Sequence, residues 1–206
     1  MKILVATRSP GKQRELRPVL RSRGIEVLFP GDIGLEPDPA EEGVESFPTF
    51  AQNAVAKAEL FFRRSGGIPT LADDSGLEVD ALEGAPGVLS KRWAGREGDG
   101  SEVDAANNAL LLSRLAQTPP DRRTARYRCV LALVEPGAPP VTFAVTTEGS
   151  ILHAPRGSGG FGYDPLFLSH DLGCTFAEAT TEAKHAVSHR GRALQEFLRC
   201  RAADPE

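Results

Sequence analysis

The chain contains the apolar run Ile68-Pro69-Thr70-Leu71, followed directly by Ala72-Asp73-Asp74-Ser75-Gly76-Leu77. The short apolar run predicts a strand, and the Asp-Asp-Ser-Gly after it predicts a glycine turn. Neighbouring side chains on a strand point to opposite faces, so one aspartate is free to face a cleft while the other supports the turn. Adjacent carboxylates favour a hard cation such as Mg²⁺. The alternative interpretation is that Asp-Asp-Ser-Gly forms only a polar turn, with no catalytic or metal-binding role.

Strands and helices alternate on either side of this stretch. Apolar runs predict strands at 3–6, 25–29, 69–71, 77–79, 127–134 and 141–147. Helical spacing predicts helices at 11–23, 50–64, 102–117 and 189–203. Ser9 and Ser101 are expected to cap two of these helices, and Pro18 is expected to kink the first. The order predicts an α/β fold with a mixed sheet, in which the two longest strands pair as a hairpin.

Composition narrows the classes of protein. With 206 residues, 40% of them hydrophobic, the chain is long enough for one domain with a sizeable core, over 1–206, with room for two lobes. A net charge of -4 gives no reason to expect binding to nucleic acid or to a membrane surface. Three widely spaced cysteines indicate neither a disulfide framework nor a zinc site, so a cytoplasmic protein is expected.

Four short motifs are candidates for binding. Thr7-Arg8-Ser9-Pro10-Gly11-Lys12 leads into a helix whose free N–H groups, with Lys12, favour phosphate, although it is not a Walker loop. In 157–165, glycines surround Phe161, which favours stacking on a nucleobase, the alternative being a ring tucked into the core. In 184–190, Ser188 precedes His189 and Arg190, which would donate hydrogen bonds from a helix start. Asn53 and Lys57 share a helix face, which taken alone is expected to be exposed.

Other chemistries are poorly supported by the sequence. Ser75 has no evident histidine partner, no cysteine has a catalytic setting, and the histidines lack zinc spacing. Asp73 and Asp74, with Glu41 or Glu42 of the acidic segment 30–48, instead favour Mg²⁺.

Taken together, five ordered blocks resemble the inosine triphosphate pyrophosphatase family, also called Ham1-like, over nearly the whole chain. The blocks are 6–16, 53–58, 72–88, 159–165 and 188–194. The resemblance implies two lobes around a long curved mixed sheet flanked by helices, with an active-site cleft between the lobes. It also implies a homodimer that uses Mg²⁺ to hydrolyse noncanonical purine triphosphates (ITP, dITP and XTP) to the monophosphate and pyrophosphate.

The resemblance also implies roles for single residues. Asp74 would be the catalytic base and a metal ligand, or a ligand only, with Glu41 as a second ligand. The residues implied to bind substrate are Thr7, Arg8, Ser9, Pro10, Gly11, Lys12, Lys57, Ser75, Phe161, Gly162, Tyr163, Asp164, Lys184, His189 and Arg190.

The chain departs from the family pattern at three places. Ser9 stands where the family has Asn, Gln52 stands where Glu is usual, and the segment from Glu41 to Thr49 is longer than usual. Two other functions remain open: a Maf-like pyrophosphatase of different base specificity, and a nucleotide-binding module without turnover.

Overall fold

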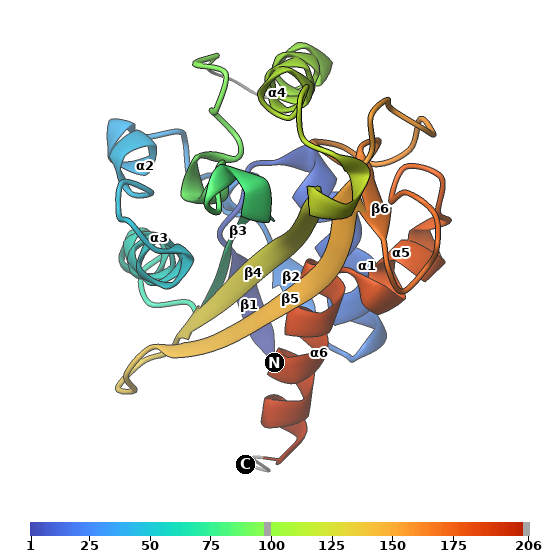
Figure 1. Cartoon of the computed structure of the whole chain (residues 1–206). Coiled ribbons are helices and arrows are strands. Elements are labelled where there is room, and N and C mark those ends of the chain that lie inside the picture. The colour runs from blue at the N-terminus through green and yellow to red at the C-terminus, as the bar shows by residue number, and fades with distance from the viewer. Residues whose placement is uncertain (97–99, 204–206) are drawn as a thin grey trace. The chain divides into compact units, whose positions relative to one another are not determined.

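The computed structural model describes residues 1–96 and 100–203, with every side chain among them except those of Glu42 and Ala203. The chain forms two compact units. Figure 1 labels their helices and strands. Unit 1 contains residues 1–74, 130–144 and the chain from 196 onward, and unit 2 contains residues 75–129 and 145–195. Each unit is described by itself below.

The described elements confirm an α/β fold with a mixed sheet. The strands are β1 (Lys2–Val5), β2 (Glu26–Leu28), β3 (Thr70–Val79), β4 (Thr124–Val134), β5 (Val141–Ile151) and β6 (Phe167–Ser169), in the order β2-β1-β3-β4-β5-β6. The helices are α1 (Pro10–Ser22), α2 (Pro39–Gly43), α3 (Phe50–Arg64), α4 (Ser101–Arg114), α5 (Thr181–Val187) and α6 (His189–Ala203). None of the helices in the described ranges combines the length and hydrophobicity of a transmembrane span.

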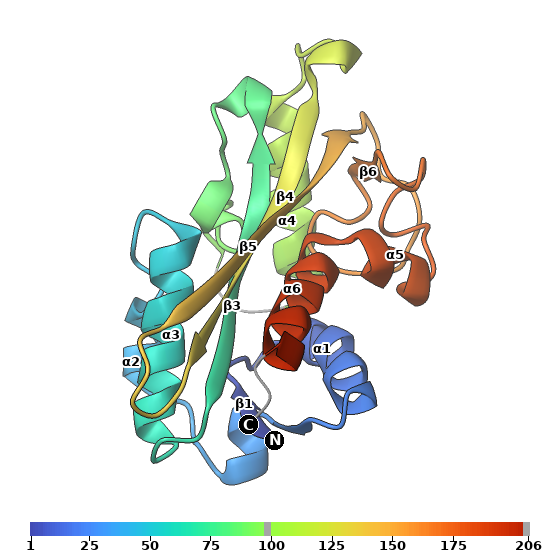
Figure 2. The ribbon, with the colours of Figure 1, turned by 90° about the horizontal axis from the view of Figure 1, so that it is seen from below.

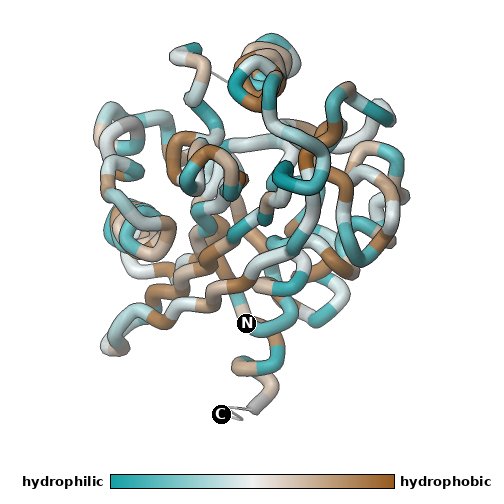
Figure 3. The backbone as a smooth tube through the Cα atoms, viewed as in Figure 1, coloured by the Kyte–Doolittle hydropathy of each residue, from teal (hydrophilic) through white to brown (hydrophobic). Residues whose placement is uncertain are grey.

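The pairing of strands shows why the sheet is mixed. In unit 1, β1 runs parallel to both β2 and β3, with Leu4 opposite Thr70. In unit 2, β5 and β6 are antiparallel, with Ser150 opposite Leu168. Hydrophobic residues recur along the strands (Figure 3), as burial requires. β4 and β5 are neighbours, as the hairpin prediction required.

Unit 1 places α1 and α3 on opposite sides of β1 and β3 (Figure 2). Thr49 caps α3 by accepting a hydrogen bond from the Gln52 amide, and Gly66 follows the helix with a φ of 74°. The buried face of α3 includes Asn53 and Lys57 among apolar side chains. The expectation that these two residues lie on an exposed face is therefore wrong.

Unit 2 has its own hydrophobic core, which includes Leu77, Leu111, Tyr127, Phe167 and Phe176. The ring of Tyr127 contacts both phenylalanine rings, at centroid distances of 4.7 and 5.9 Å.

Arg123 is 2% exposed at the edge of this core. Its guanidinium donates to three backbone carbonyls, those of Leu115 (2.7 Å), Ile151 (2.8 Å) and Leu152 (2.9 Å). Burial lowers the pKa of Arg123.

Local expectations were wrong at two points. Asp73 to Gly76 do not form a turn, because β3 continues from Thr70 to Val79 and joins the two short strands expected there. Ser101 does not cap α4: Gly100 holds that position and Ser101 is the first helical residue. Pro18 lies inside α1, and the kink expected there stays a prediction.

Candidate active site

The first part of the site is the loop from Thr7 to Lys12 in unit 1. Ser9 caps α1 as predicted, since its hydroxyl accepts a hydrogen bond from the Lys12 amide (3.5 Å) and Pro10 begins the helix. The Thr7 hydroxyl accepts a second hydrogen bond, from the Ser9 amide (3.2 Å). The loop is thus fixed by its own side chains, with the N-terminal dipole of α1 behind it.

The two adjacent aspartates are held from opposite faces of β3. The Asp73 carboxylate pairs with the Lys12 ammonium of α1 (3.0 Å), and the Asp74 carboxylate accepts from the Asn53 side-chain amide of α3 (3.0 Å). Both aspartates are buried. The strand alternation expected from the sequence therefore gives each carboxylate a different supporting helix.

Lys57 links this pair to a third carboxylate. Its buried ammonium donates to the Glu45 carboxylate and to the Asp73 carbonyl oxygen. Burial alone lowers the pKa of Lys57, but the charges of Glu45 and Asp73 outweigh it and raise that pKa. Lys57 therefore stays protonated, and its cation holds Glu45 beside the aspartates.

Asp74 is the carboxylate most perturbed by this environment. Burial raises its pKa to about 6, Glu45 adds to that rise, and Lys57, Lys12 and the Asn53 hydrogen bond oppose it. Glu45 shows the reverse balance, because the two lysines outweigh burial and lower its pKa. A pKa near neutrality is the property that a proton acceptor needs.

This donor set suits Mg²⁺ better than zinc. Among the described residues no three His, Cys, Asp or Glu side chains are grouped as a ready metal cage. Mg²⁺ does not require one, because one or two carboxylates plus substrate phosphates commonly hold it. Asp74 and Glu45 are the pair of oxygen donors that fits that pattern.

Glu41, the second metal ligand implied by the sequence, lies in a different cluster. Its carboxylate accepts from Arg8 through two hydrogen bonds (2.7 and 2.8 Å) and also pairs with Arg64. Glu45 is the acidic residue that sequence reasoning missed. Its only signal was its place in the same acidic segment.

In unit 2, the Phe161 ring is partly exposed and lies among cations. The Lys184 ammonium is 4.9 Å from the ring centroid, and the Arg190 guanidinium carbon is 5.7 Å from it. Asp164 accepts from the Lys184 ammonium (2.7 Å) and from the Phe161 amide (2.9 Å). Only glycine fits at Gly160, because a Cβ there would lie 2.0 Å from the Asp164 carboxylate.

The start of α6 brings two more predicted residues to unit 2. Ser188 accepts from the Gly191 amide (3.1 Å), which confirms it as a cap. Arg190 donates to the Ser75 hydroxyl (2.9 Å). The His189 ring stacks on Tyr127 at 4.5 Å and 11°, and both rings are buried. Tyr127 thus fixes the plane of the imidazole, a contact that sequence reasoning missed.

Helix α4 holds the peptide groups next to Phe161. The Asp104 carboxylate accepts from the Gly162 amide (2.7 Å), and the Asn108 side-chain amide donates to the Gly162 carbonyl (2.9 Å). Gly162 has a φ of 62°, a conformation that these two contacts stabilise. Neighbouring Tyr163 is buried and donates to the Ser90 carbonyl (2.9 Å).

We expect Asp104→Ala to loosen this loop and to raise KM for the substrate by about 10-fold or more, because a hydrogen bond to a charged group contributes about 1.5 to 3 kcal/mol. Glu102→Ala is the matched control, because Glu102 lies in the same first turn of α4 and is exposed. Steady-state kinetics of both variants check this, and equal KM values would show that Asp104 only complements the helix dipole.

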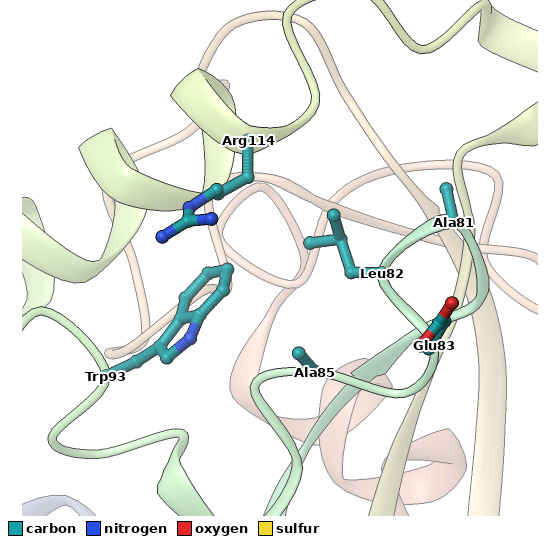
Figure 4. Close-up of a pocket in the computed structure, with 6 residues that line it drawn as sticks. All are labelled: Ala81, Leu82, Glu83, Ala85, Trp93 and Arg114. Atoms are coloured by element: carbon teal, nitrogen blue, oxygen red, sulfur yellow. The ribbon is translucent and has the colours of Figure 1, made fainter.

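Two pockets in the described part of the chain lie away from these side chains. One, of about 310 Å³ in unit 2, is lined by Trp93 and Leu82 with Arg114 beside them (Figure 4). The other, of about 370 Å³ in unit 1, lies along the outer face of α3 near Phe47. Neither is lined by a residue predicted for the site.

Comparison with known proteins places the chain in a class. The model of the Ham1 family matches residues 3–200. The chain belongs to the Ham1 family.

Relatives and solved structures are similar over nearly their whole length. A dITP/XTP pyrophosphatase of Geobacter sulfurreducens is 48% identical over 94% of this chain and 92% of its own, and one of Exiguobacterium sibiricum is 49% identical over 96% and 95%. The structure of a HAM1 protein from Coxiella burnetii matches with a TM-score of 0.84 at 33% identity, covering 99% of this chain and 100% of that one.

Proposed function

We propose that this protein hydrolyses noncanonical purine nucleoside triphosphates, namely ITP, dITP and XTP, to the monophosphate and pyrophosphate, with Mg²⁺ as the metal. The observation that carries the proposal is the buried Asp74, whose pKa of about 6 is set beside Glu45 and two lysines. The names of the relatives, dITP/XTP pyrophosphatases, support the substrate class. The family resemblance further supports a homodimer that works in the cytosol.

Each group in unit 1 has a task at the triphosphate. Lys12 and the amide groups at the start of α1 bind phosphate oxygens, and Asp74 and Glu45 would hold Mg²⁺. The metal would supply charge neutralisation at the phosphates. Asp74, ionised above its pKa of about 6, accepts the proton of the water that attacks the α-phosphorus as pyrophosphate leaves. Lys57 acts on the carboxylates rather than on phosphate.

The groups in unit 2 select the base. Phe161 stacks on the purine, and Lys184, His189 and Arg190 are donors for the 6-oxo group of hypoxanthine or xanthine. Adenine carries an amino group there, which leaves such donors unpaired. A site built on hydrogen-bond donors can therefore discriminate by about 10⁴-fold.

A substrate panel tests the proposal. Purified protein with Mg²⁺ should release pyrophosphate from ITP, dITP and XTP at a kcat/KM far above that for GTP, ATP or dTTP. Faster release from dTTP would point to a pyrophosphatase of other base specificity. Binding of ITP without release of pyrophosphate would reduce the protein to a nucleotide-binding module.

We expect Phe161→Ala to raise KM for ITP by about 5- to 150-fold, the equivalent of one lost base stack, with a much smaller change in kcat. Phe161→Tyr is the control, because it keeps the ring and should stay near the parent. If Phe161→Ala instead lowers the melting temperature and leaves the kinetics of the folded fraction unchanged, the ring belongs to the core.

A further inference from the structure

A cluster of charges in unit 1 stands outside the catalytic groups assigned above. Its centre is Glu41, whose carboxylate receives two hydrogen bonds from the Arg8 guanidinium (2.7 and 2.8 Å) and a further contact from Arg64. Both guanidinium groups also lie near the Phe61 ring, at 6.0 and 5.7 Å from its centroid. The contact between Arg8 and Glu41 is bidentate, and a bidentate contact fixes the relative position of two side chains in addition to pairing their charges.

The cluster joins three segments that are far apart in the sequence. Arg8 belongs to the phosphate loop, Glu41 to α2 in the acidic segment, and Arg64 to the last turn of α3. The two arginines also donate to backbone carbonyls of that segment, Arg8 to Leu35 (2.8 Å) and Arg64 to Glu36 (2.7 Å). The acidic segment is therefore fastened to both the loop and the helix.

The same segment carries Glu45, two residues beyond the end of α2 at Gly43. Glu45 is held by Lys57, which lies seven positions before Arg64 on α3 and so on the same face of that helix. The stretch from Glu41 to Glu45 is thus anchored to α3 at both of its ends.

The charges argue against a metal at Glu41. Both carboxylate oxygens of Glu41 already accept from guanidinium groups, one from Arg8 and the other from Arg8 and Arg64, and these two cations are the charges that act on Glu41. Around Asp74 the three carboxylates Glu45, Asp73 and Asp74 face two lysines, a net negative charge. A divalent cation is attracted to the second cluster and not to the first.

We propose that Glu41 is a positioning residue: through Arg8 and Arg64 it fixes the phosphate loop and the segment that carries Glu45. This inference rests on the proposed function of the same site. In this arrangement Arg8 connects the phosphate loop to Glu41 through its guanidinium. The phosphates are bound by Lys12 and by the backbone amides at the start of α1.

A double-mutant cycle on the full-length protein tests the positioning role. Glu41→Gln, Arg8→Gln and the double variant are compared for binding of Mn²⁺, followed by electron paramagnetic resonance, and for binding of pyrophosphate with Mg²⁺, followed by calorimetry. Each single change should weaken pyrophosphate binding by about 3- to 10-fold, and the double variant should be no weaker than either, as expected for residues that act as one unit. Mn²⁺ affinity depends on Asp74 and on Glu45, which Lys57 holds as well, so it should fall by no more than about 3-fold and no further in the double variant than in either single one.

Controls separate this role from two others. Glu59→Gln breaks an exposed pair with Arg63 on α3 and should change neither binding constant. A loss of Mn²⁺ affinity of about 10-fold or more in Glu41→Gln, additive with Arg8→Gln, would make Glu41 a metal ligand and overturn the inference. Pyrophosphate binding that tightens in Glu41→Gln and weakens in Arg8→Gln would also overturn it, because Arg8 would then bind phosphate directly.

Both binding measurements are independent of turnover. If the parent protein hydrolyses no member of the substrate panel, the proposed function fails, and the cycle still decides whether Glu41 acts through Arg8. Melting temperatures of all variants show whether the proteins compared are folded. Arg8→Lys is measured with them, because it keeps the positive charge of Arg8 but loses the bidentate contact with Glu41.

Discussion

Asp74→Asn should reduce pyrophosphate release from ITP by about 10³-fold or more, because it removes both the proton acceptor and a metal ligand. The same change should make the protein more stable at neutral pH. The free carboxylate is buried, and its pKa is raised from 3.8 to about 6, so the folded state holds the charged form at a cost. Asn keeps the shape without the charge.

The pH range of the stability effect follows from that shift. Below pH 3.8 the Asp74 carboxyl is protonated in both the folded and the unfolded protein, so it does not change the free energy of unfolding. The destabilisation grows between pH 3.8 and about 6 and is complete above that range. Two pKa units correspond to about 3 kcal/mol, which is an upper bound for the gain in Asp74→Asn. Chemical denaturation at pH 7.5 and at pH 4 measures it, and the gain should be present only at the higher pH.

Asp73→Asn is the matched control for that experiment. Asp73 is paired with Lys12 at 3.0 Å, so its loss should not stabilise the protein. If Asp74→Asn retains activity near that of the parent with Mg²⁺, Asp74 has no part in the mechanism. An equal loss of stability in both variants would mean that Asp74 is a structural carboxylate.

Lys57→Met should lower the free energy of unfolding by about 3 to 5 kcal/mol, the usual cost of removing one partner from a buried ion pair. The methionine fills the space of the stem, but Glu45 loses its cation and the Asp73 carbonyl loses a donor. Activity should fall as well, because Glu45 is no longer held. Urea denaturation and ITP kinetics measure the two effects.

Two further variants show what the effect of Lys57→Met means. Lys2→Met removes a half-exposed lysine from its pair with Glu26 and should cost no more than about 1 kcal/mol. Adding Glu45→Gln to Lys57→Met should restore part of the stability by removing the stranded charge, but not the activity. If Lys57→Met costs as little as Lys2→Met, the buried pair is not what orders the acidic segment.

The fold could be predicted from sequence wherever local chemistry marked the ends of elements. The limits of α3 and α6 match the prediction, because Thr49 and Ser188 provide caps and Gly66 provides a left-handed residue. The strand β3 could not be read in the same way. Its Asp, Ser and Gly residues favour turns locally, yet burial and the place of β3 inside the sheet keep them extended.

The sequence indicated the separate motifs of the candidate site, but not the contacts between their side chains. The residues around Asp74 and Phe161 were found from sequence, because short motifs carry them. Glu45 and Asp104 were not found, since their partners lie 12 and 58 positions away and no periodicity connects them. Burial of Asn53 and Lys57 was missed for the same reason: the helix pattern gives a face, and only tertiary packing says what covers it.

The buried guanidinium of Arg123 has a consequence for how unit 2 opens. Its three acceptors, on Leu115, Ile151 and Leu152, come from the end of α4 and from the end of β5. Exposure of any one of these carbonyls breaks its hydrogen bond to the same buried guanidinium, which couples the end of α4 to the end of β5. We therefore expect the two segments to open together, with amide protons that exchange at similar rates.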